Sequence, residues 1–180
     1  MKAVSKELPG FIGRTTVAHV SLYFIFGIIF GVLIKGGHVM YAIEELEIYF
    51  RPLSHPLVMS SSFLNIFRGI IIALALYPFR EKLFRDKYGW FYLWVLLGIL
   101  GILSVYGAAP GSLEGVIYTK LPMWYHLRYL PDNLLHTLTF SVLLFLWERK
   151  KSKLVSIPLY IVFGFIVAIQ VMMFASGKLG

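Results

Sequence analysis

The sequence predicts an all-α integral membrane protein: a bundle of five transmembrane helices, an interfacial amphipathic helix and a structured outer loop. Two observations predict this class. Of the 180 residues, 58% are hydrophobic and only 14% are charged, which is unusual for a soluble domain. The apolar runs have transmembrane length, and short basic loops separate them. The length suits a single transmembrane domain covering residues 1–180.

Composition excludes several classes of partner and site. The net charge of +8 could suggest nucleic acid, but Lys and Arg cluster in short loops between apolar spans, as membrane topology requires. We therefore expect no nucleic-acid partner. The chain has no cysteine, which excludes disulfides and thiolate-bound metals. The basic residues 1–14 precede a long apolar run without a small-x-small cleavage site, so we expect a retained signal-anchor helix.

The first expected helix covers residues 15–34. Gly27 and Gly31 form a G-x-x-x-G step within it, which would permit close approach of another helix. Residues 36–56 form the first outer segment. Its acidic residues alternate with aromatic and aliphatic ones, which favours a short amphipathic helix lying in the membrane interface.

The second and third helices are expected at 57–79 and 90–106. Gly98 and Gly101 lie in the interior of the third helix and predict a close-packing surface. The connection 107–131 is too apolar for a free loop and too interrupted by Pro and Gly for a spanning helix. Irregular backbone at membrane depth must be buried in protein or line a cavity, so we expect a re-entrant or lid segment on the outer side.

The fourth helix is expected at 132–147, with Asp132 as its N-cap, and the fifth at 154–175. The basic segments are the N-terminus, the loop 80–87 and the loop 148–153, whereas the other connections are neutral or acidic. The positive-inside rule then places the N-terminus in the cytoplasm and the C-terminus outside. We expect the plasma or inner membrane.

The second helix has an arginine near its middle. Arg68 lies ten positions before Pro78, about 15 Å at the helical rise and half of a ~30 Å hydrocarbon layer. Its side chain is too short to reach water from that depth, so Arg68 is expected to face other helices or a wet cavity and to have a partner. Ser61 and Asn65 share its face, so a polar stripe leads from Arg68 to the outer end.

The polar half of the fourth helix ends at a similar depth. His136 lies 11 residues before Trp147, about 16 Å from the cytoplasmic edge. These depths predict an outward-facing polar pocket with Arg68 at its floor. A guanidinium is a planar fork of donors suited to a carboxylate or a phosphate. The expected ligand-binding residues are Arg68, His136, Asn65, Ser61, Glu114, Asn133 and Thr137.

The sequence has no signature of a known catalytic or cofactor site. It contains no G-x-S-x-G, no H-E-x-x-H and no phosphate-binding loop. A haem held by two histidines would need them at one depth, and His19 is expected near the cytoplasmic edge whereas His136 is near the midplane. We expect no cofactor and no metal, assign no catalytic residue, and favour a non-enzymatic role.

The leading hypothesis is a membrane protein that binds or transports an anionic small molecule or lipid headgroup through Arg68. The main alternative is a non-catalytic accessory or assembly subunit, in which Arg68 and the glycine face of the first helix dock onto other membrane subunits. A weaker alternative is a membrane enzyme acting on lipid headgroups. In a purely structural interpretation, Arg68 pairs with Glu114 or with helix carbonyls to fix the packing.

Overall fold

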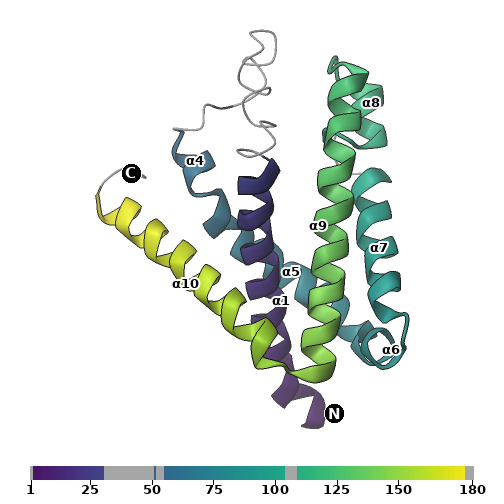
Figure 1. Cartoon of the computed structure of the whole chain (residues 1–180), viewed down its shortest axis with the longest axis vertical. Helices are drawn as coiled ribbons and strands as arrows, with labels where there is room; N and C mark the ends of the chain where they lie inside the picture. The colour runs from purple at the N-terminus through teal and green to yellow at the C-terminus, as the bar shows by residue number, and fades with distance from the viewer. Residues whose placement is uncertain (1, 31–50, 52–54, 104–108, 177–180) are drawn as a thin grey trace.

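The computed structural model describes residues 2–30 (backbone only for 2–6), 51, 55–103 and 109–176 (Figure 1). These ranges are helical and contain no strand. The elements are α1 (Lys2–Ile28), α4 (Pro56–Met59), α5 (Ser61–Leu76), η2 (Tyr77–Phe79), α6 (Arg80–Arg85), α7 (Gly89–Leu103), α8 (Leu113–Tyr118), α9 (Met123–Lys150) and α10 (Lys153–Ala175).

In the described part of the chain, three helical segments are long and apolar enough to cross a membrane. They are Glu7–Ile28, Ser61–Arg85 and Lys153–Ala175. A fourth, α7, is apolar but has only 15 residues. The expected all-α membrane protein is therefore confirmed at this level.

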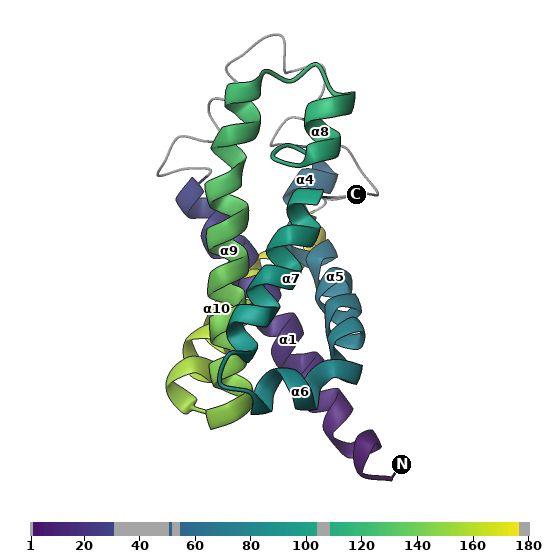
Figure 2. The same ribbon diagram turned by 90° about the vertical axis from the view of Figure 1, so that its right-hand side faces the viewer.

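Helix α1 lies at the centre of the bundle. It packs against α5, α9 and α10, and α7 packs along α9 on the far side (Figures 1 and 2). Helix α10 diverges from the others and exposes most of its surface. The apolar core joins α1, α5, α7 and α9. Its buried side chains include Phe11, Leu22, Ala73, Leu93 and Leu144.

An ionic cluster joins three helices near the N-terminal end of the bundle. The carboxylate of Glu148 on α9 is 1% exposed, and it accepts hydrogen bonds from the Nε atoms of Arg14 on α1 and Arg80 on α6. The second of these bonds is 3.2 Å long. Arg80 also forms an ion pair with Glu7. We expected Glu148 to belong to the basic loop 148–153, but α9 continues through it to Lys150.

Two helices begin earlier than the sequence suggests. Helix α1 starts at Lys2 instead of 15, and α9 at Met123 instead of 132, and each contains a proline, Pro9 and Pro131. An internal proline removes one backbone hydrogen bond and costs about 3 kcal/mol. Packing offsets this cost in α9, because Tyr125 and His126 in its first turn are buried. Asp132 is therefore a mid-helix residue and not the N-cap.

The outer segments are described only in part. Within the expected segment 107–131, α8 begins at Leu113 and is capped by Ser112, whose hydroxyl accepts a hydrogen bond from Gly115 N at 2.9 Å. Helix α8 packs against α7 and α9 (Figure 2). The amphipathic helix expected at 36–56 lies, except for Arg51 and His55–Pro56, outside the described residues.

Glycines mark the closest helix contacts. A Cβ on Gly69 of α5 would lie 2.8 Å from Cα of Thr16 on α1, so these two backbones nearly touch. The expected packing surface of α7 is confirmed, since a Cβ on Gly101 would lie 2.7 Å from Nδ2 of Asn133 on α9. In contrast, no described residue lies within 4 Å of the Cβ position of Gly27 in the G-x-x-x-G step, and Gly31 lies outside the described residues.

We expect Gly69→Ala to destabilise the contact between α1 and α5. The new methyl group would press on backbone, which cannot rotate away, and such overpacking costs about 1–3 kcal/mol. The midpoint of thermal unfolding in detergent should fall. Gly164→Ala on α10 is the matched control, because nothing lies within 4 Å of its Cβ position. Equal unfolding midpoints for Gly69→Ala and Gly164→Ala would show that α1 and α5 can move apart without loss of stability.

Candidate functional site

Two histidines from different helices lie side by side within the bundle. The ring centroids of His19 on α1 and His136 on α9 are 6.1 Å apart. His19 is 5% exposed. Aromatic rings enclose the pair: Phe140 packs edge-on against His19, and Phe26 lies 5.3 Å from His136 between ring centroids. The imidazoles therefore share one largely apolar compartment.

This proximity corrects the depth expected for His19. We expected His19 near the cytoplasmic edge, because α1 was expected to begin after Arg14. The helix instead extends back to Lys2, and Arg14 pairs with the buried Glu148 inside the bundle. His19 therefore lies at the depth of His136, and the argument from depth against a group held between the two rings is wrong. Among the described residues, no three His, Cys, Asp or Glu side chains gather as metal ligands.

Arg68 and Asn65 reach the same compartment from α5. The charge of Arg68 acts on both imidazoles. Asn65 is buried close to His19, and it donates from Nδ2 to the carbonyl of Ser61 at 2.9 Å. Arg68 itself is exposed, and no carboxylate in the described part of the chain forms an ion pair with it. The cluster thus has a cation without a described counter-ion.

Several buried polar atoms around this cluster lack hydrogen-bond partners among the described residues. They are Nε2 of His19, Nε2 of His136, and the hydroxyls of Thr15 and Thr16. A buried polar atom without a partner costs about 1–3 kcal/mol, and native proteins leave few of them. An unpaired pair of imidazole nitrogens beside a guanidinium is therefore a candidate site for a hydrogen-bonding group.

A cavity of about 450 Å³ adjoins the cluster between α1, α5 and α9, in the half of the bundle away from the N-terminus. His136 forms part of its wall, so the cavity and the histidine pair are contiguous. Residues of α5 and α9 form a polar wall of the cavity, and the C-terminal end of α1 forms the opposite wall. The lining residues are Tyr23, Phe24, Phe26, Gly27, Ile28, Ser61, Ser62, Tyr129, Asp132 and His136.

The structure brings together some of the residues expected to bind a ligand. Ser61 and His136 line the cavity, and Asn65 and Arg68 follow Ser61 along α5 toward the histidine pair. The four residues mark a polar region that extends from the cavity wall along α5, although Asn65 and Arg68 do not themselves line the cavity.

The other three expected residues lie elsewhere. Asn133 and Thr137 face α7, where they contact Gly101 and Gly98. The Thr137 hydroxyl also donates to the carbonyl of Asn133 at 2.8 Å. Glu114 lies on α8, whose contacts are with α7 and α9, and it forms no ion pair with Arg68.

Sequence reasoning missed His19, Asp132 and Tyr129 as members of this region. One signal was available, because residues four apart share a helix face. Asp132 and His136 have this spacing, as do His19 and Tyr23. Because α9 begins at Met123, Asp132 and His136 lie within one continuous helix, and both line the cavity.

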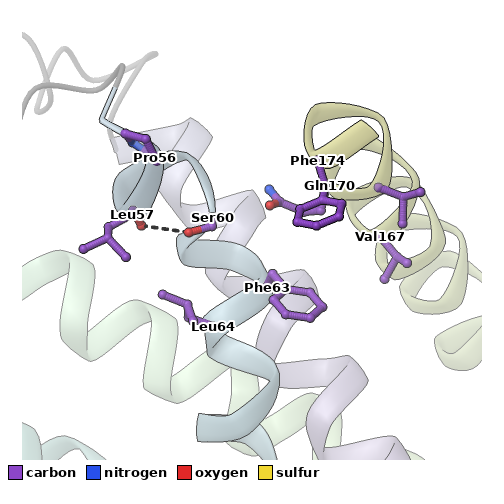
Figure 3. Close-up of a pocket in the computed structure, with 9 residues that line it drawn as sticks. Pro56, Leu57, Ser60, Phe63, Leu64, Val167, Gln170 and Phe174 are labelled. Atoms are coloured by element: carbon purple, nitrogen blue, oxygen red, sulfur yellow. Dashed lines mark hydrogen bonds between the residues drawn. The ribbon is translucent and has the colours of Figure 1, made fainter. Parts of the chain in front are cut away.

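A separate apolar pocket of about 430 Å³ lies between α10 and the start of α5 (Figure 3). Gln170 closes one side by donating from Nε2 to the carbonyl of Met59 at 2.9 Å. Phe63, Leu64 and Phe174 contribute apolar walls. None of its lining residues is charged, and none lines the polar cavity.

No protein-family model matches the chain, and comparisons with curated proteins and with solved structures find no similar protein. The function is therefore inferred from the chemistry of the polar region. Guanidinium and imidazole N–H groups are donors, and the partner that suits them is an acceptor with negative charge.

Proposed function

We propose that the protein binds or transports an anionic small molecule or lipid headgroup, with Arg68 as the charge anchor. The strongest support is that polar atoms of Arg68 and the two nearby imidazoles lack ionic or hydrogen-bond partners among the described residues. Arg68 has no described carboxylate partner, and the two imidazoles beside it each have a buried Nε2 without a hydrogen bond. A carboxylate or phosphate would supply acceptors to all three groups.

The cost of a charge within a membrane favours this function. An arginine at the centre of a spanning helix costs several kcal/mol unless water, a counter-ion or protein covers it. Arg68 is exposed and lies about midway along α5. A guanidinium binds a carboxylate or phosphate through two parallel hydrogen bonds, which offsets more of this cost than a single bond does.

Asp132 sets the orientation of the proposed ligand. It lies one turn before His136 on α9 and lines the cavity. Its carboxylate would repel the anionic group, which we therefore place at the inner end near Arg68. A hydroxyl or ammonium group on the rest of the ligand would be bound by Asp132 at the outer end. The ligand expected from this arrangement is an anion that also bears a donor.

We also infer the topology from the pattern of charge. Helices α7 and α9 would complete five spans, with the N-terminus in the cytoplasm and the C-terminus outside the plasma or inner membrane. Helix α9 has 28 residues, about 42 Å, which exceeds the ~30 Å of a hydrocarbon layer. The basic segments 80–87 and 148–153 lie at the same end of the bundle as the N-terminus, around α6 and the junction of α9 with α10 (Figure 1), which agrees with the positive-inside rule.

The test is Arg68→Met, which keeps an unbranched apolar stem and removes the guanidinium with its charge. Native mass spectrometry of protein purified gently from its own membrane should show a bound anionic ligand that the variant loses. A charge-assisted hydrogen bond contributes about 1.5–3 kcal/mol, so affinity should fall about 10- to 100-fold. Arg85→Met is the matched control, because the Arg85 side chain is 81% exposed and remote from the cavity. Equal ligand retention by both variants would refute the proposal.

The second candidate is an accessory subunit of a larger membrane complex. Two exposed features favour it: Arg68, and Gly27, whose Cβ position has no atom within 4 Å. An acidic residue of a partner helix could pair with Arg68, and the open glycine would permit close approach. The same mass spectra distinguish this function, because it predicts unrelated chains bound to the wild type and lost from Arg68→Met.

A further inference from the structure

An apolar groove of about 410 Å³ lies on the membrane-facing side between α1 and α10. The described residues that line it are all aliphatic or aromatic: Phe24, Ile25, Ile28, Ile29, Ile161, Val162 and Phe165. Both helices belong to segments long and apolar enough to cross a membrane. The groove therefore faces the hydrocarbon of the bilayer.

This groove and the polar cavity share two residues. Phe24 and Ile28 line both. Successive residues are 100° apart around a helix, so Phe24 and Ile28 form one narrow stripe along α1. Tyr23 and Gly27 lie on one side of the stripe and line the cavity, whereas Ile25 and Ile29 lie on the other side and line the groove. The polar and apolar sites are therefore adjacent sectors of one surface.

We propose that the bound anion is the headgroup of a lipid whose acyl chain lies in the groove between α1 and α10. This inference rests on the proposed function and specifies its ligand class. A soluble anion would use the cavity alone. A molecule with a charged end and an apolar chain would satisfy Arg68 and the imidazoles and cover the groove at once. Each space lies within the volume of common ligand sites, about 300–1,000 Å³.

The apolar pocket of Figure 3 does not serve this role. It shares no lining residue with the polar cavity, and it uses Val167, Val171 and Phe174 on the opposite face of α10 from Ile161 and Phe165. A chain in that pocket would have no direct route to a headgroup beside His136. The pocket therefore provides a control surface on the same helix.

The experiment compares two probes with a common charged group: dioleoyl phosphatidic acid and soluble glycerol 3-phosphate. Native mass spectrometry of the full chain in detergent measures the affinity of each. Ile161→Trp fills the groove, and Val171→Trp is its control, since these side chains belong to residues that are 65% and 61% exposed. We expect the lipid to bind more tightly than glycerol 3-phosphate. Ile161→Trp should weaken lipid binding about tenfold, which corresponds to roughly 1.4 kcal/mol.

Ile161→Trp should leave the affinity for glycerol 3-phosphate unchanged, which also shows that the variant is folded. The lipid inference fails if the lipid binds no more tightly than glycerol 3-phosphate, or if Ile161→Trp and Val171→Trp weaken lipid binding equally. In those cases, loss of both probes in Arg68→Met would still support the proposed function. If Arg68→Met binds both probes like the wild type, the proposed function itself is refuted.

Discussion

Replacing Glu148 by glutamine is expected to destabilise the bundle more than any other change of a single charge considered above. The Glu148 carboxylate is 1% exposed and holds Arg14 and Arg80, whose side chains are 19% and 21% exposed. The variant leaves two partly buried cations with no common counter-ion. Removing one partner of a buried ion pair lowers the free energy of unfolding by about 3–5 kcal/mol. The midpoint of thermal unfolding in detergent measures this loss.

Glu81→Gln is the control for Glu148→Gln. Glu81 also pairs with an arginine, Arg85, at 3.7 Å, but the two side chains are 79% and 81% exposed. Exposed pairs contribute less than about 1 kcal/mol, so this variant should unfold at nearly the temperature of the wild type. If Glu148→Gln also unfolds at the wild-type temperature, α1, α6 and α9 are held together by their apolar core alone.

Gly89→Ala is expected to displace α7. A Cβ on Gly89 would lie 1.5 Å from the carbonyl oxygen of Leu83 and 3.1 Å from the ring of Phe145. The first of these contacts is with backbone, so no side-chain rotation relieves it. The turn between α6 and α7 must open, and Leu93 and Trp90 would lose part of their packing on the core. We expect a loss at or above the upper end of the ~1–3 kcal/mol typical of overpacking.

Thermal unfolding and the yield of monodisperse protein after size exclusion measure the effect of Gly89→Ala. Gly13→Ala is the control, since nothing lies within 4 Å of its Cβ position. The alanine should be neutral or slightly stabilising there, because a helical glycine is less favourable than alanine by up to about 1 kcal/mol. Similar unfolding temperatures for both variants would show that the turn before α7 adapts freely.

The class of the protein and the bounds of its most apolar candidate span were predictable from composition and apolar length. The fifth helix was expected at 154–175, and α10 is Lys153–Ala175. The close-packing surface at Gly101 on α7 was also predictable, because small residues within an apolar helix have few other roles. These features depend on residues that are near one another in the chain.

The starts of α1 and α9 were not predictable in the same way. Proline is a strong local signal for a helix boundary, and Pro131 was interpreted accordingly. Burial of Tyr125 and His126 before that proline offsets the lost hydrogen bond, and the turn before α8 contributes to it, because Gly111 N donates to Nδ1 of His126. The depth of His19 was not predictable for a related reason, since α1 extends back to Lys2 and Arg14 pairs with the buried Glu148 of α9.

By itself, the sequence determined that this is a helical membrane protein with an arginine inside an apolar helix, because hydropathy and helical periodicity are local properties. Only the tertiary structure decided which residues surround that arginine. It placed His19 beside His136 and turned Asn133 toward α7. Neighbours across a bundle depend on the rotation and depth of each helix, and those are fixed by contacts between distant segments, such as Gly69 with Thr16.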